Sequence, residues 1–128
     1  MTERRTIGEL LEAARGRLDR LTPAAAWAEA QAGSIIVDTR SEDARRREGT
    51  IPGAIAIPLS VLYWRADPTS GFEDPRIADP DRRLIILCAH GFSSSLAAAT
   101  LRDLGFHRAT DVDGGFEAWA EDGLPVEA

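Results

Sequence analysis

Residues 84–106, LIILCAHGFSSSLAAATLRDLGF, decide the fold class of this chain. The stretch opens with four apolar residues, LIIL, a pattern typical of a strand that is covered on both faces. Cys88 and a short glycine-containing loop follow, and the next residues predict a helix over about 92–104. A strand joined by a tight loop to a helix is the building unit of parallel α/β proteins, so the stretch favours that architecture.

The same alternation continues on both sides of this stretch. A β-branched run, IIV at 35–37, follows a helix that Thr22 caps, Pro23 starts and Gly33 ends. Strands that alternate with helices predict an α/β fold with a central parallel sheet of about five strands and helices on both faces. The other expected elements are a helix over 41–48, a strand around 54–57, a short helix over 60–65, a strand near 109–112 and a last helix containing Phe116 and Trp119.

The length of 128 residues suits a single domain. Apolar residues at helical spacing near the N-terminus follow a capping box formed by Thr6 and Glu9, which predicts an amphipathic helix. We therefore divide the chain into an N-terminal helical extension, residues 1–18, and a domain over residues 19–128. The segment 66–83 is rich in proline and acidic residues, and a loop of that length is expected to be functional or partly mobile.

The composition excludes several classes of function. All 15 basic residues are arginines, and with 21 acidic residues the formal net charge is −6. We expect no nucleic-acid partner, because such binding requires a basic field. No apolar run approaches the roughly 18 residues of a membrane span, so we expect a cytoplasmic protein without a membrane partner. One cysteine cannot form an internal disulfide, and with two histidines it does not supply a common zinc framework.

Cys88 lies where parallel α/β proteins place reactive groups. It comes directly after a strand and directly before a helix, at the edge of the sheet where unpaired N–H groups and the positive end of a helix dipole stabilise a thiolate. Gly91 allows a tight loop, and the hydroxyls of Ser93 and Ser94 can cap the helix or donate to a charged sulfur. A buried structural cysteine is the alternative interpretation.

Four segments together resemble the single-domain rhodaneses, a family of sulfurtransferases. The resemblance extends from about Leu21 to Val126 and rests on the order and spacing of the segments rather than on any one of them. The segments are VDTR at 37–40, GTIPGAIAIP at 49–58, CAHGFSS at 88–94 and DVDGGFEAWAEDGLPV at 111–126.

The resemblance implies a reaction at Cys88. In such enzymes the cysteine takes the outer sulfur of a donor such as thiosulfate, holds it as a persulfide and delivers it to a thiol or cyanide-like acceptor. A sulfur-carrier protein is a further candidate acceptor, and no cofactor is implied. Backbone N–H groups of the six residues after the cysteine form a cradle for the sulfur, the same principle as an oxyanion hole. These residues are Ala89, His90, Gly91, Phe92, Ser93 and Ser94.

The loop departs from the family pattern at Ser93, where many rhodaneses have arginine. His90 is the only ionisable side chain left within the cradle, and histidine titrates near neutrality. We hypothesise that Arg65, which follows the strand around 54–57, replaces the missing cation. Tyr63 and Trp64 would then wall the acceptor side, although packing of a short helix is their alternative role.

Two further residues end a strand at the same edge of the sheet. We expect Asp38 and Arg40 to brace the loop beside Cys88 or to shape its pocket.

Three other functions compete with sulfur transfer. A phosphatase built on a cysteine loop needs arginine six residues after the cysteine, and Ser94 occupies that position. A redox switch lacks a second cysteine to resolve a sulfenic acid within the chain. The remaining competitor is a non-catalytic rhodanese-like module that binds a partner or senses persulfide.

Overall fold

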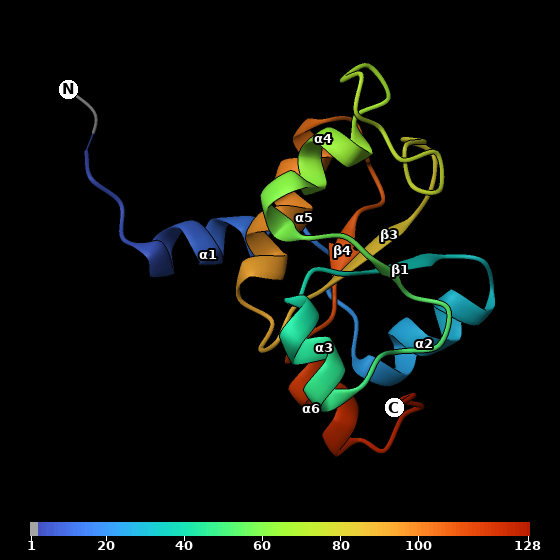
Figure 1. The fold of residues 1–128 in the computed structure, drawn as a ribbon. Helices are drawn as coiled ribbons and strands as arrows, with labels where there is room; N and C mark the ends of the chain where they lie inside the picture. Colours follow the sequence, from blue (N-terminus) through green and yellow to red (C-terminus); the bar gives the residue numbers. More distant parts are fainter. Residues whose placement is uncertain (1–2) are drawn as a thin grey trace.

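The computed structural model describes residues 3–128 and has an α/β fold. Within these residues four strands form one parallel sheet in the order β2-β1-β3-β4 (Figure 1). The longest pairing sets Asp38, at the end of β1, opposite Leu87, at the end of β3, so both strands finish at the same edge. The strands are β1 (Ile35–Asp38), β2 (Ile55–Ala56), β3 (Leu84–Leu87) and β4 (Thr110–Asp111).

The expected sheet of about five strands is corrected to four. In place of a fifth strand there is an isolated bridge, in which Leu21 lies parallel to Val112, the residue after β4. Leu21 cannot extend into a strand because Pro23 begins a helix two residues later and offers no N–H for a ladder.

Six α-helices and one 3₁₀ turn are found within residues 3–128, largely where caps and periodicity predict them. Side chains of Thr6, Thr22 and Ser41 each accept a hydrogen bond from the first turn of the helix that follows. The expected helix over 60–65 is a 3₁₀ turn continued by a short helix. The elements are α1 (Ile7–Arg15), α2 (Pro23–Gln31), α3 (Glu42–Glu48), η1 (Leu59–Val61), α4 (Leu62–Ala66), α5 (Ser93–Asp103) and α6 (Gly115–Glu121).

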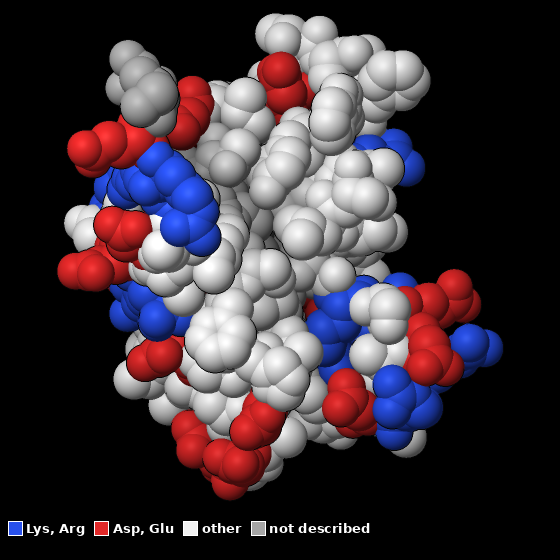
Figure 2. Space-filling view, turned by 90° about the vertical axis from the view of Figure 1, so that its left-hand side faces the viewer, with Lys and Arg blue, Asp and Glu red and all other residues white. Residues whose placement is uncertain are grey.

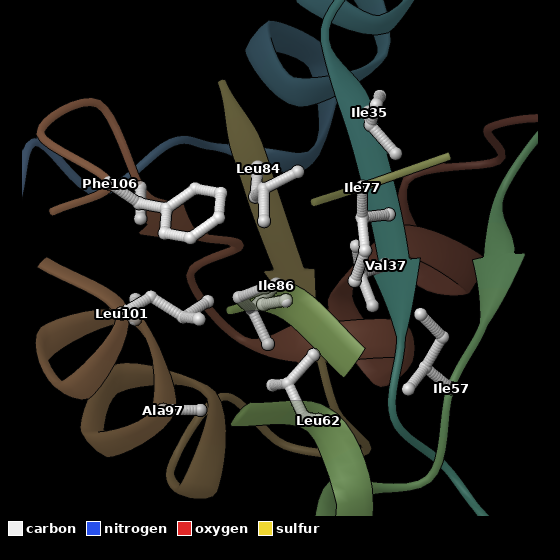
Figure 3. Close-up of a cluster of buried hydrophobic side chains, with 13 residues drawn as sticks. Ile35, Val37, Ile57, Leu62, Ile77, Leu84, Ile86, Ala97, Leu101 and Phe106 are labelled. Atoms are coloured by element: carbon white, nitrogen blue, oxygen red, sulfur yellow. The ribbon is translucent and has the colours of Figure 1, made fainter. Parts of the chain in front are cut away.

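Alternate residues of the two central strands face two separate apolar layers. Val37 and Ile86 pack with α4 and α5 on one side, in the cluster drawn in Figure 3. Ile36 and Ile85 pack with α2 and α6 on the other side. This two-sided burial explains why the strands are continuously apolar, and it places helices on both faces of the sheet, as expected (Figure 1).

Residues 67–83 form no helix or strand, yet the segment is anchored to the body of the protein. Ile77 is fully buried in the core, and the N–H of Asp74 donates to the carbonyl of Arg65. Arg76 pairs with Asp74 and, mainly through that hydrogen bond, lowers the pKa of Asp74 to about 2.

The N-terminal helix packs on the body of the protein. α1 lies against α5, and Arg17 forms an ion pair with Asp103 (Figure 1). The division of the chain into an extension over residues 1–18 and a domain over residues 19–128 stays a prediction. Residues 1 and 2 of that extension lie outside the described part of the chain. No helix within residues 3–128 has the length and apolar character to cross a membrane. The cytoplasmic location also stays a prediction.

Candidate active site

Cys88 lies at the carboxyl edge of the sheet, in the loop between β3 and α5, drawn in gold in Figure 1. It is buried, with 7% of its surface exposed. The N-terminus of α5 begins at Ser93, so the positive end of an eleven-residue helix lies beside the loop. Figure 2 views this edge of the molecule and shows a hollow lined by uncharged atoms, with acidic and basic residues around it.

The sulfur of Cys88 accepts hydrogen bonds that favour its ionised form. The N–H of Gly91 donates to Sγ at 3.1 Å. Burial of the thiol opposes ionisation, but hydrogen bonds from Ser94, Ser93 and Gly91 outweigh it and hold the pKa of Cys88 below its ordinary value of 9.0. The hydroxyl of Ser94 also lies 2.7 Å from Asp111 Oδ2, to which it donates, so it links the sulfur's surroundings to a buried carboxylate.

The start of α6 holds one side of the loop. The N–H groups of Phe116 and Glu117 donate to the carbonyls of Cys88 and Ala89, at 2.8 and 3.1 Å. Gly115 makes this approach possible, because a Cβ there would lie 2.5 Å from the Cys88 carbonyl oxygen. Gly115 of the DVDGG segment therefore allows close packing against the cysteine loop, whereas a Cβ at Gly114 would meet Ala118.

Two arginines and a carboxylate hold the other side of the loop. Arg15 and Arg20 both donate to the carbonyl of Gly91, at 2.8 and 3.0 Å. Arg20 also forms an ion pair with Asp111, which is fully buried. Sequence reasoning missed all three residues. Asp111 ends a strand at the same edge and could have been noticed on that ground, whereas no local pattern marks Arg15 or Arg20.

The six cradle residues differ in how far they are exposed to solvent. Ala89, His90 and Phe92 are exposed, and His90 Nδ1 lies 2.8 Å from a carboxylate oxygen of Glu117. Ser93 is half-buried, while Gly91 and Ser94 are buried. Next to the loop is a hollow of about 400 Å³, lined by Glu48, Ala89, His90, Phe116, Glu117, Ala120 and Glu121.

Asp38 and Arg40 form a buried pair beside the loop. Arg40 Nη2 lies 2.8 Å from Asp38 Oδ2 and also donates to the carbonyl of Gly49. Its guanidinium stacks 3.7 Å from the centre of the Phe116 ring. These contacts connect the end of β1 to Gly49, at the end of α3, and to α6, whose first residues donate to the cysteine loop.

Arg65 makes its contacts away from Cys88. It donates to the carbonyl of Phe72, and within residues 3–128 no hydrogen bond or ion pair links it to the cysteine loop. Tyr63 packs at the edge of the core, and Trp64 is 54% exposed. The hypothesis that Arg65 replaces the loop cation stays a prediction. A second open hollow, of about 530 Å³, is lined by Ser60, Val61, Trp64, Arg65 and Phe72.

Residues 22–122 match the family model of the rhodanese-like domain. The chain belongs to the rhodanese-like family. Thiosulfate sulfurtransferase GlpE of Pseudomonas syringae is 38% identical over 100 residues, which cover 78% of this chain and 85% of that protein. GlpE of Haemophilus influenzae is 30% identical over 84% of this chain and 92% of its own length. GlpE of Vibrio cholerae is 47% identical over 51 residues, which span 40% of this chain and about half, 48%, of that relative.

Solved structures show the same rhodanese-like fold. A protein of unknown function from Rhodopseudomonas palustris, described as a possible tyrosine phosphatase, is 34% identical, with a TM-score of 0.89 over 99% of this chain and 98% of its own. A rhodanese-related protein from Thermoplasma volcanium is 30% identical, with a TM-score of 0.67 over 84% of this chain and 95% of its own. The first of these similarities extends beyond residues 22–122 into the N-terminal helix.

Proposed function

We propose that this rhodanese-like protein is a sulfurtransferase that moves a sulfane sulfur through a persulfide on Cys88. The observation that carries the proposal is the placement of Sγ, 3.1 Å from the N–H of Gly91 and beside the N-terminus of α5, where the thiol ionises below its ordinary pKa. The curated relatives named as thiosulfate sulfurtransferases support the choice of reaction.

The reaction balances with one thiolate and no cofactor. The Cys88 thiolate attacks the outer sulfur of thiosulfate, a new S–S bond forms, and sulfite leaves with the electron pair of the bond that breaks. The acceptor, a thiolate or cyanide, then attacks the terminal sulfur of the persulfide, and Cys88 leaves as a thiolate. Negative charge remains at the sulfur throughout, which is the charge that fixed N–H donors stabilise.

Several chemical classes of acceptor would fit the exposed side of the loop. The exposed residues Ala89, His90 and Phe92 lie at the rim of the loop, where a small thiol, cyanide or the thiol group of a sulfur-carrier protein would approach. Tyr63 and Trp64 belong to this proposal as walls of the acceptor side, and Asp38 with Arg40 as support for the loop.

Intact-mass measurement after incubation with a donor tests the proposal. We expect the protein to gain one sulfur atom with thiosulfate and to lose it to cyanide, with one equivalent of thiocyanate formed. The Cys88→Ser variant should gain none. Thiosulfate, mercaptopyruvate and a protein persulfide form the donor panel, and no gain of sulfur from any of them would favour the non-catalytic binding module.

Phosphate-ester hydrolysis is a second reaction to test, because the Rhodopseudomonas palustris neighbour is described as a possible tyrosine phosphatase. Ser94 stands where a phosphatase loop needs its arginine, and its hydroxyl is bound to Asp111. We therefore expect no hydrolysis of p-nitrophenyl phosphate above the level of Cys88→Ser. Hydrolysis that depends on Cys88 would contradict this expectation.

A further inference from the structure

Arg20 and Arg15 meet at one atom of the cysteine loop. Both guanidinium groups donate to the carbonyl oxygen of Gly91, while the N–H of the same residue donates to the sulfur of Cys88. Gly91 is thereby held at both of its peptide groups, with a φ of 83° that favours glycine. Both arginines precede residue 22, where the family-model match begins.

A buried carboxylate extends the hold to α5. Asp111 accepts from Arg20 Nε at 2.9 Å and from the hydroxyls of Ser94 and Ser95 at 2.7 and 2.8 Å. Ser94 and Ser95 belong to the first turn of α5, whose N–H groups face the loop. The network therefore fixes the donors on either side of the sulfur.

We propose that Arg15 and Arg20 are positioning residues for Cys88, which hold Gly91 against the sulfur and place positive charge behind a loop that has no arginine of its own. The proposal deepens the proposed function, since it concerns the same cysteine. In this protein the cation comes from the segment around α1 rather than from the loop, where Ser93 stands.

The charges around Cys88 agree with this assignment. Burial opposes the charge of Arg20, but its hydrogen bonds and attraction to Asp111, and its attraction to Asp113 and to the Cys88 thiolate, raise the pKa of Arg20. Attraction between two groups is mutual, so Arg20 favours the thiolate in turn. Arg15 forms no ion pair with an acidic residue within residues 3–128, and its charge stacks 5.7 Å from the centre of the Phe92 ring.

Most of the other charged groups near the loop are paired with one another. These other groups are Asp113, bound to Arg20; His90 with Glu117 from α6; Asp38 with Arg40 at the end of β1; and Glu48 and Glu121 around the adjacent hollow.

The primary test measures the pKa of Cys88 from the pH dependence of its alkylation by iodoacetamide. Arg15→Gln removes a cation without leaving a buried carboxylate unpaired, so it should fold. We expect it to raise the pKa of Cys88 by about 1 unit, the lower end of the range for a nearby charge. Arg17→Gln is the matched control, because Arg17 lies in the same segment but pairs with the exposed Asp103. It should leave the pKa unchanged.

Variants at Arg20 test the second cation. Arg20→Gln should raise the pKa of Cys88 at least as much as Arg15→Gln, with the fold checked by circular dichroism. Because Arg20→Gln leaves Asp111 with only hydroxyl partners, the double variant Arg20→Gln with Asp111→Asn provides a neutral replacement for the pair and should show a raised pKa as well. Arg20→Lys keeps the positive charge, so the pKa of Cys88 in this variant should be closer to the wild-type value.

The outcomes separate this inference from the proposed function. Alkylation requires no sulfur transfer, so a raised pKa in Arg15→Gln and the double variant supports the inference even if no donor is found. A pKa equal to that of the wild type in both variants would overturn it, whether or not Cys88 carries a persulfide. If the protein does take sulfur from thiosulfate, the rate at neutral pH should fall in Arg15→Gln and not in Arg17→Gln.

Discussion

The ionisation of Cys88 links the site to the stability of the fold. A thiol whose pKa is lower in the folded than in the unfolded chain stabilises the fold where it is charged. That contribution is complete above the unfolded value of about 8.5–9 and is lost as the pH falls through the folded pKa.

We therefore expect the wild type to gain stability relative to Cys88→Ser as the pH rises from about 6 to about 9. Urea unfolding of both proteins across this range measures the difference in the free energy of unfolding. Parallel pH profiles would show that the thiol ionises equally in the two states.

Gly115, the first residue of α6, lies so close to the cysteine loop that a side chain does not fit there. It has a φ of 62°, and a Cβ would lie 2.5 Å from the carbonyl oxygen of Cys88 and 2.7 Å from the nitrogen of Gly91. Gly123 has a similar φ of 72° but open space around it, so it isolates the cost of backbone strain.

Gly123→Ala should cost about 1–2 kcal/mol of strain and leave the alkylation rate of Cys88 unchanged. Gly115→Ala should cost more than about 2 kcal/mol, because the clash displaces backbone, and should slow alkylation. Chemical unfolding and iodoacetamide kinetics measure both effects. Equal losses in the two variants would mean that the close approach has no effect on the site.

At the scale of elements, α5 joins the core to the site. Its N-terminus faces Cys88, and Leu101 near its end is fully buried in the cluster of Figure 3. Leu104, at the end of the same helix, is 38% exposed.

Leu101→Ala should destabilise the protein by about 2–5 kcal/mol, the usual cost of a large-to-small change in a core. Leu104→Ala should cost about 0.5 kcal/mol or less, because the side chain is partly in water. The free energies of unfolding of the two variants test the assignment, and similar values would show that α5 is not buried on the face described.

Elements with local signals were predictable from the sequence. Caps at Thr22 and Ser41 placed the starts of α2 and α3, and the run LIIL placed β3. Strands of two residues, β2 and β4, depend on pairing with their neighbours, so their bounds could only be approximate. The five-strand sheet failed for the same reason, since the single bridge at Leu21 has no pattern of its own.

The site was predictable only in part. Cys88 followed from its position between a strand and a helix, and its cradle from the family resemblance. Arg15 and Arg20 lie more than 70 residues from Gly91 along the chain. The contact of Arg15 arises from the packing of α1 on α5, and that of Arg20 from the segment beside the Leu21–Val112 bridge. Charged residues of an amphipathic helix look alike in a sequence, so nothing local distinguishes Arg15 from Arg17.

At the scale of the whole molecule, the N-terminal helix and the sheet are connected through the site. α1 packs on α5, and Arg15 bonds to both Gly91 and Ser95. The chain as a whole has a net charge of −6, whereas two arginines, Arg15 and Arg20, contact the cysteine loop.

We expect residues 7–128 to unfold in a single cooperative transition. Far-ultraviolet circular dichroism, which includes α1, and tryptophan fluorescence, to which the buried Trp119 contributes with Trp27 and Trp64, should give the same midpoint in urea. An early loss of helix signal before the fluorescence change would instead support a separate N-terminal extension.

The carbonyl groups of Cys88, Ala89 and Gly91 all accept hydrogen bonds from outside the loop. A segment anchored in this way has given up its conformational entropy during folding. Binding of a sulfur atom to Cys88 therefore removes little conformational freedom from the loop. The activation entropy of sulfur uptake should depend on the donor and its hydration water rather than on the protein. The loop would act as a rigid part of the fold at every temperature below the unfolding transition.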